Sequence, residues 1–89
     1  MGKGEISWKR TNAEGERFVL YAHHVGDRWQ FFIRQRRYEQ WQALKEPPLE
    51  DWLKLLDGVR RRAGRRLMRP EEIRHVKQLI RERFPEAES

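Results

Sequence analysis

The sequence has few of the side chains that most enzymes use. It contains no cysteine, which excludes a disulfide and a thiolate metal site. Its only serine and threonine residues are Ser7, Thr11 and Ser89, and none of them lies in a nucleophile elbow or another catalytic motif. A P-loop and a dinucleotide fingerprint are also missing. We therefore expect a protein that is not an enzyme and that binds no cofactor.

Histidine is also scarce. His23 and His24 are adjacent in a predicted strand, so their side chains point to opposite faces and cannot chelate one ion together. A zinc site normally takes three or four protein ligands. We therefore expect no bound metal, and we interpret His24 as a buried ring beside Trp29 that is hydrogen-bonded to the backbone.

Long apolar runs are missing as well. The longest covers only a few residues, whereas a transmembrane helix needs about 20, and the N-terminus lacks the apolar core of a secretory signal. We therefore expect a cytoplasmic protein that does not bind membranes. A length of 89 residues corresponds to one small domain, which we predict over residues 1 to 85, with a frayed tail over residues 86 to 89.

What the sequence does have is a local excess of positive charge. The net charge of +6 comes from 20 basic and 14 acidic residues. Residues 58 to 69 hold six arginines and no acid, so the rest of the chain sums to zero. Arginine outnumbers lysine fifteen to five, and arginine binds phosphate bidentately and stacks on bases. This ratio suits a nucleic-acid ligand, although a GC-rich genome produces the same excess.

Three segments in the first half have the alternation of apolar and polar residues that is typical of β-strands. In the turn between the first two, we expect Asn12 and Gly15 to adopt positive φ angles. Gly26 and Asp27 form a two-residue hairpin turn between the second and the third. The predicted strands cover residues 5–10, 16–25 and 28–36.

The hairpin turn determines which side chains share a face of the sheet. With Gly26 and Asp27 as the loop, Val25 lies opposite Arg28, and the other pairs follow from there. One face is apolar and should be buried; it carries the pairs His24–Trp29, Ala22–Phe31, Leu20–Ile33 and Phe18–Gln35. The opposite face carries His23–Gln30, Tyr21–Phe32, Val19–Arg34 and Arg17–Arg36.

Two amphipathic helices are predicted in the second half, from Pro48 to Gly64 and from Pro70 to Pro85. Residues 37–46 are ambiguous, because they fit either a helical turn or a segment that crosses the core. The predicted fold is α+β, with a three-stranded antiparallel meander (β-β-β) followed by two α-helices packed on one sheet face. The predicted core consists of Trp8, Leu20, Trp29, Phe31, Ile33, Trp52, Leu56, Ile73, Val76 and Ile80.

The open face of the sheet is the first candidate binding site. Tyr21 and Phe32 form a central cross-strand pair, and several RNA-binding folds stack unpaired bases on such aromatics. The pair is equally consistent with a solvated face that the aromatics stabilise, or with a surface for a partner protein. The cations expected around the pair are Arg17, Arg28, Arg34, Arg36 and His23.

The arginine-rich stretch is the second candidate. Some of its arginines fall in the last turn of a predicted helix, where cations complement the helix dipole. The others lie in the connection to the next helix. The helix dipole does not explain six arginines without a balancing acid, whereas a bound polyanion would relieve their mutual repulsion. The six are Arg60, Arg61, Arg62, Arg65, Arg66 and Arg69.

These two candidates lead to two functional hypotheses. The first is a basic domain that binds RNA or DNA with little sequence specificity, through the arginines and the aromatic sheet face. A helix-turn-helix mode is disfavoured, because the last helix would present Glu71 and Glu72 to the DNA. The alternative is a protein-interaction module that binds an acidic partner or a second copy of itself. Joint exposure of Tyr21, Phe32, Tyr38 and Trp41 would favour this alternative.

Overall fold

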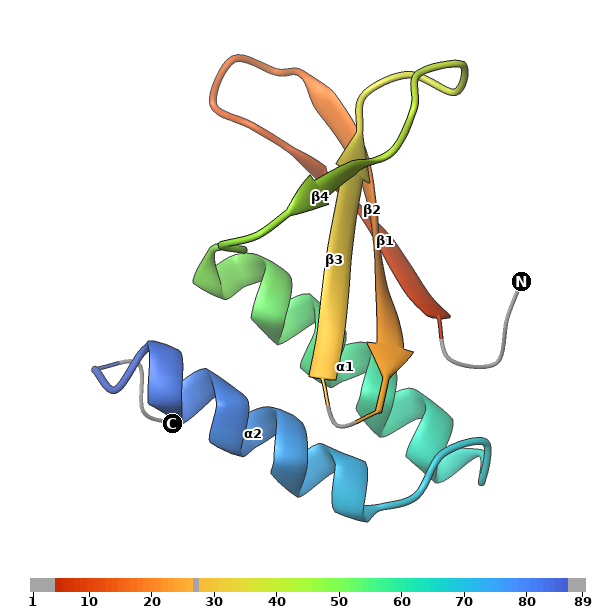
Figure 1. The fold of residues 1–89 in the computed structure, drawn as a ribbon, viewed down its shortest axis with the longest axis vertical. Coiled ribbons are helices and arrows are strands. Elements are labelled where there is room, and N and C mark those ends of the chain that lie inside the picture. Colours follow the sequence, from red (N-terminus) through yellow and green to blue (C-terminus); the bar gives the residue numbers. More distant parts are fainter. Residues whose placement is uncertain (1–4, 27, 87–89) are drawn as a thin grey trace. The chain divides into compact units, whose positions relative to one another are not determined.

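The computed structural model describes residues 5 to 26 and 28 to 86. These residues form a β-β-β meander with a short fourth strand, followed by two helices, which confirms the predicted α+β fold (Figure 1). The chain divides into two compact units, Met1–Pro47 and Pro48–Ser89, which are described separately below. The packing of the helices on the sheet stays a prediction. The single domain over residues 1 to 85 also stays a prediction. The strands are β1 (Glu5–Thr11), β2 (Arg17–Val25), β3 (Arg28–Arg34) and β4 (Gln42–Leu44), and the helices are α1 (Leu49–Gly64) and α2 (Glu71–Arg83).

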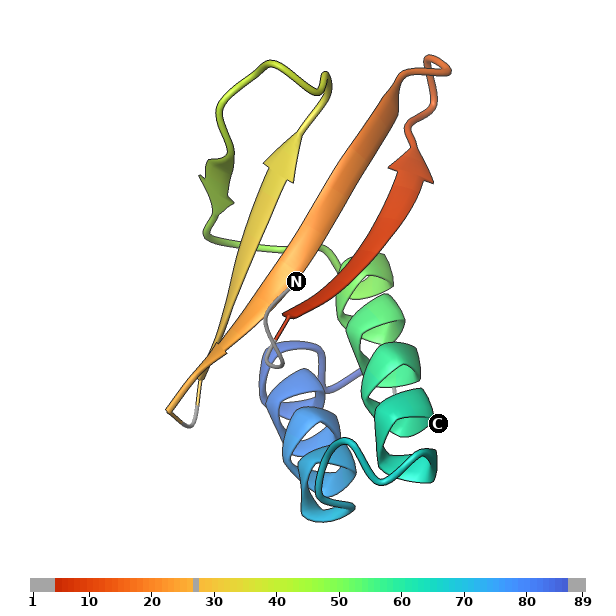
Figure 2. The same ribbon diagram turned by 90° about the vertical axis from the view of Figure 1, so that its right-hand side faces the viewer.

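The first unit is an antiparallel sheet in the order β1-β2-β3-β4 (Figure 2). Val25 pairs with Arg28, and the predicted β2–β3 register is confirmed as far as the pair Val19–Arg34. β3 ends at Arg34, two residues earlier than expected, so the predicted pairs Phe18–Gln35 and Arg17–Arg36 lie beyond the ladder. The buried apolar side chains of this unit share one face, as the alternation requires. They are Ile6, Leu20, Ala22, Trp29 and Phe31.

The two turns of the meander use glycine where the backbone has a positive φ angle. Gly15 has φ of 83° and Gly26 has φ of 62°, a region that costs glycine little. The expectation of a positive φ at Asn12 is wrong. Instead the Asn12 side-chain oxygen accepts hydrogen bonds from the backbone N–H groups of Glu14 and Glu16, at 3.0 and 2.9 Å. Asp27, the other predicted hairpin residue, lies outside the described residues.

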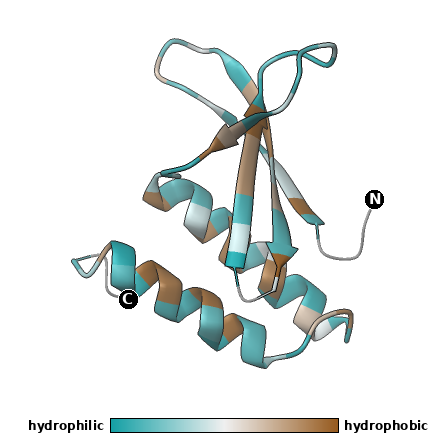
Figure 3. Cartoon of the chain, in the orientation of Figure 1, coloured by the Kyte–Doolittle hydropathy of each residue, from teal (hydrophilic) through white to brown (hydrophobic). Residues whose placement is uncertain are grey.

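The second unit is a helical hairpin in which α1 and α2 run side by side in opposite directions (Figures 1 and 2). Hydrophilic and hydrophobic positions alternate along α2 (Figure 3), as expected for an amphipathic helix. The guanidinium of Arg83 on α2 lies 4.9 Å from the ring centroid of Trp52 on α1. Neither helix is long and apolar enough to cross a membrane, within the described residues. Residues 87 to 89 of the predicted C-terminal tail lie outside the residues that the structure describes.

The predicted core needs several corrections. Trp8, Ile33 and Ile73 are only half-buried. Leu55 was missed, although it is fully buried and lies at helical spacing from the buried residues Trp52 and Val59. Asp51 is also fully buried, although its place in the first turn of α1 led us to expect only a helix-dipole role. The core residues of the second unit are Trp52, Leu55, Leu56, Val59, Val76 and Ile80.

Candidate functional site

The central feature of the open sheet face is an aromatic stack. Tyr21 on β2 and Phe32 on β3 are direct partners in the ladder. Their ring centroids are 4.9 Å apart and the rings are inclined by 20°, so the predicted cross-strand pair is present as a stack. Both side chains are half-buried. We call this side of the sheet, opposite the buried residues, the aromatic face.

Trp41 joins this stack from the connection between β3 and β4. Its ring meets Tyr21 edge-to-face, with 4.7 Å between centroids and 89° between planes. The guanidinium of Arg34 lies 4.3 Å from the Trp41 ring centroid, and its Nη1 donates a 3.5 Å hydrogen bond to the Glu39 carbonyl. Sequence reasoning missed the role of Trp41, because the path of residues 37 to 46 was ambiguous. The result is a cluster of three aromatic rings and one stacked arginine.

Exposed cations surround this cluster. Arg17 and Arg28 are at opposite ends of the β2–β3 hairpin and are both exposed, as predicted. Lys9 of β1 pairs with Val19, so the alternation of strand side chains places it on the aromatic face as well. His23 lies opposite Glu5, with 3.8 Å between His23 Nδ1 and a Glu5 carboxylate oxygen, so its surroundings are less basic than expected.

Arg36 lies beyond the end of β3, so its predicted pairing with Arg17 is absent from the ladder. Because β3 ends at Arg34, Arg36 falls in the turn that follows. Its backbone N–H donates to the Glu39 carboxylate at 2.7 Å, and its guanidinium donates to the Tyr38 hydroxyl at 2.8 Å. The role that these contacts indicate for Arg36 is to hold the β3–β4 connection in place.

The six predicted arginines of the second candidate lie at the end of α1 and in the connection to α2. Arg61 is paired with Asp57, at 2.6 Å between Nη2 and the carboxylate, so an acid just outside the stretch balances one of the six charges. Arg62 is half-buried and the other five are exposed. Within the described part of the chain, four of them form no ion pair, and we call these four the open arginines. They are Arg60, Arg65, Arg66 and Arg69.

The helix ends in a motif that places an arginine in the left-handed region. Gly64 is the last residue of α1, as predicted, but the residue with a positive φ of 61° is Arg66. The N–H of Leu67 donates to the Arg62 carbonyl at 2.8 Å, and the N–H of Arg66 donates to the Ala63 carbonyl at 3.0 Å. This pair of hydrogen bonds is the Schellman pattern, in which glycine usually takes the left-handed position.

We expect the substitution Arg66→Gly to stabilise the protein. A side chain in the left-handed region costs about 1 kcal/mol relative to glycine, and the exposed Arg66 makes no ion pair with a described residue that would offset this cost. The free energy of unfolding should rise by about 0.5–1 kcal/mol in urea denaturation. Arg65→Gly is the matched control, because Arg65 has φ of −95° and gains no such relief. Equal effects of the two substitutions would contradict the argument.

Other kinds of site find less support among the described residues. No group of three or more His, Cys, Asp or Glu side chains within residues 5–26 and 28–86 is arranged to hold a metal ion. The ring of His24 stacks on Trp29, with 4.5 Å between centroids, which agrees with its predicted position, but it is half-buried rather than buried. Comparisons with protein-family models, curated proteins and solved structures find no match. Functional inference therefore rests on the aromatic face in the first unit and the open arginines in the second.

Proposed function

We propose that this protein binds single-stranded nucleic acid with little sequence specificity. The observation that carries the proposal is the cluster of Tyr21, Phe32 and Trp41 with Arg34 stacked on the tryptophan. Unpaired bases stack on aromatic rings and on guanidinium planes, and each base–aromatic stack contributes about 1–3 kcal/mol. Every base has a flat face, so such a surface binds many sequences.

The charges near the cluster support the same ligand. Lys9, Arg17 and Arg28 are exposed on the aromatic face, where the phosphates of a strand stacked on the rings would pass. The open arginines of the second unit add a region that neutralises phosphates without reading bases. In this proposal, the aromatic face selects unpaired bases, and the open arginines add affinity that falls as salt increases.

The structure offers less to the rival hypothesis of a protein-interaction surface. Joint exposure of the four aromatics would favour that hypothesis, but Tyr21, Phe32 and Trp41 are half-buried and, of the four, only Tyr38, at 78%, is strongly exposed. The four aromatics therefore do not form a wide exposed apolar patch. Self-association and binding of an acidic protein become outcomes of the test.

An amide-shift titration of labelled protein tests the proposal. We would add single-stranded RNA, duplex DNA and heparin, each at two salt concentrations, and measure the oligomeric state by sedimentation. We expect RNA, but not heparin, to shift the signals of Tyr21, Phe32 and Trp41. Shifts confined to residues 60 to 69, equal for all three polyanions and abolished by salt, would reduce the site to a general anion patch. Absence of shifts near physiological salt would refute nucleic-acid binding.

A further inference from the structure

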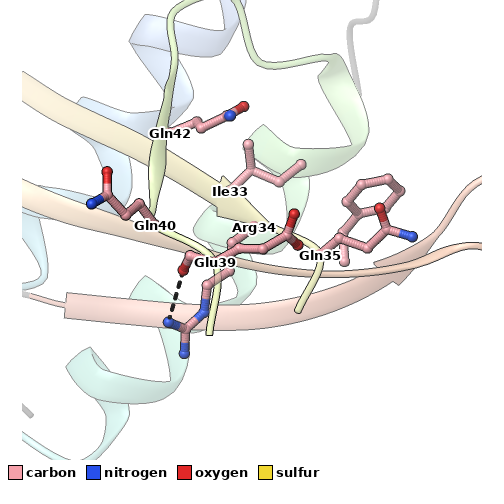
Figure 4. Close-up of a pocket in the computed structure, with 7 residues that line it drawn as sticks. Ile33, Arg34, Gln35, Glu39, Gln40 and Gln42 are labelled. Carbon is pink, nitrogen blue, oxygen red and sulfur yellow. Dashed lines mark hydrogen bonds between the residues drawn. The ribbon is translucent and has the colours of Figure 1, made fainter. Parts of the chain in front are cut away.

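Two adjoining hollows lie at the end of the sheet where the β1–β2 turn and the β3–β4 connection meet. The first has a volume of about 140 Å³ (Figure 4). Phe18 and Ile33 supply apolar surface to it, and Gln35 and Gln42 supply amides. Gln42 pairs with Ile33 across the β3–β4 ladder, so these two side chains share a face of the sheet. The remaining lining comes from Arg34, Glu39 and Gln40.

The second hollow is larger and basic. It has a volume of about 370 Å³ and borders the first, with which it shares the lining residues Phe18 and Gln35. Three of its lining residues are cations, and none of its described lining residues is an acid. Two of the cations, Lys9 and Arg17, are exposed, and the third, Arg10, lies with its guanidinium 5.8 Å from the Phe18 ring centroid. The full lining is Lys9, Arg10, Thr11, Arg17, Phe18, Val19 and Gln35.

We propose that these two hollows together bind one nucleotide, with the base in the first and its phosphate in the second. A base needs an apolar surface for its flat face and hydrogen-bonding groups for its edge, and the first hollow offers Phe18, Ile33 and two amides. A phosphate needs cations or N–H donors, and the second hollow offers Lys9 and Arg17, which the alternation of strand side chains places on one face. Phe18 and Gln35 stand at the junction, where the sugar would lie.

The carboxylates near the hollows determine which bases fit. Glu39 lines the first hollow, and Glu16 lies beside Gln35, with 3.4 Å between its carboxylate and the Gln35 amide nitrogen. A carboxylate accepts hydrogen bonds from the exocyclic amino group of a base but gives none. The site should therefore bind adenine, cytosine or guanine more tightly than uracil, which has no such amino group. Glu39 lines the first hollow alone, and the lining of the second hollow contains no acid.

This inference rests on the proposed function and adds a base-reading position to it. Arg34 lines the first hollow and stacks on Trp41, while Lys9 and Val19 belong to both the second hollow and the aromatic face. The residues that line the two hollows and those of the aromatic face all lie in the first unit. The apolar lining of the first hollow belongs to the opposite face, so a strand stacked on the aromatic face would pass around the end of the sheet to place one further nucleotide in the two hollows.

The test compares ligands that contain different parts of a nucleotide. Labelled full-length protein is titrated with adenosine, cytidine and uridine monophosphates, with inorganic phosphate, and with a trinucleotide. We expect the adenosine and cytidine monophosphates to shift Phe18 and the side-chain amides of Gln35 and Gln42, and to bind severalfold more tightly than the uridine form. A trinucleotide that binds more tightly than the monophosphates would identify a strand as the source of the nucleotide. If phosphate alone gives the same shifts, the base site is wrong.

Single substitutions distinguish the contributions of the two hollows to nucleotide binding. Gln42→Leu should weaken adenosine monophosphate binding roughly fivefold, the loss of one hydrogen bond, and leave phosphate binding unchanged. Arg17→Gln should weaken both ligands by a similar or larger factor. Arg37→Gln is the matched control, since Arg37 is exposed in the same connection and lines neither hollow. Equal losses in all three variants would overturn the proposal.

The outcomes also separate this inference from the proposed function. If RNA shifts Trp41 and Phe32 but no nucleotide shifts the Gln35 and Gln42 amides, the aromatic face stands and the nucleotide site fails. If mononucleotides shift those amides while RNA leaves Trp41 unchanged, the nucleotide site stands and the stacking function fails.

Discussion

Replacement of the four open arginines by glutamine is expected to reduce the salt dependence of RNA binding strongly. Each phosphate contact on a single strand contributes about 0.7 to the slope of log affinity against log salt. If each open arginine neutralises one phosphate, the quadruple variant loses about 3 units of slope (roughly 0.7 for each of four contacts). Fluorescence anisotropy with a labelled RNA at several salt concentrations measures this slope. The variant carries Arg60→Gln, Arg65→Gln, Arg66→Gln and Arg69→Gln.

A control with the same loss of charge shows whether position matters. Four other cations of the second unit are also exposed and form no ion pair with a described residue. Their replacement lowers the net charge by the same amount, so long-range attraction changes equally in the two variants. An equal loss of slope in both would mean that RNA responds to total charge and not to the open arginines. The control carries Lys54→Gln, Arg74→Gln, Lys77→Gln and Arg81→Gln.

The β2–β3 hairpin was predictable from sequence because two local features agree there. Alternation defines the two faces, and the turn at Gly26 sets which residues are opposite one another. The prediction was wrong at the end of β3, where we extended the strand to Arg36 through polar residues but the strand stops at Arg34. The hydrogen bond from the Arg36 N–H to the Glu39 carboxylate forms a turn there, and an alternation pattern carries no information about such a bond.

The candidate site was predictable where it depends on strands and unpredictable where it depends on connections. The Tyr21–Phe32 stack follows from register alone. The position of Trp41 depends on the path of a connection and on β4, which at three residues is too short for a periodic signal. The end of α1 gives a similar example. Gly64 correctly predicted the last residue of the helix, but the residue with a positive φ angle is Arg66, because the turn that ends the helix closes two residues later.

Trp41 is therefore the residue whose removal tests the aromatic face most directly. We expect Trp41→Leu to weaken single-stranded RNA binding roughly 5- to 150-fold, which corresponds to the loss of one base–aromatic stack. Heparin has no bases, so its affinity should not change. Equilibrium titration with both polyanions measures the two effects on the same protein. A parallel fall in heparin affinity would show that the substitution acts through Arg34, whose guanidinium stacks on the tryptophan ring.

Tyr38→Leu provides the matched aromatic control, because Tyr38 lies in the same connection, is exposed and makes no ring contact with a described residue. Loss of the contact between Trp41 and Tyr21 should also lower the free energy of unfolding, by about 0.5–1.5 kcal/mol. Urea denaturation of both variants shows whether Trp41→Leu remains folded under the binding conditions. If the folded Trp41 variant binds RNA as tightly as the Tyr38 variant does, the rings serve only to stabilise the sheet, and base stacking on this face is refuted.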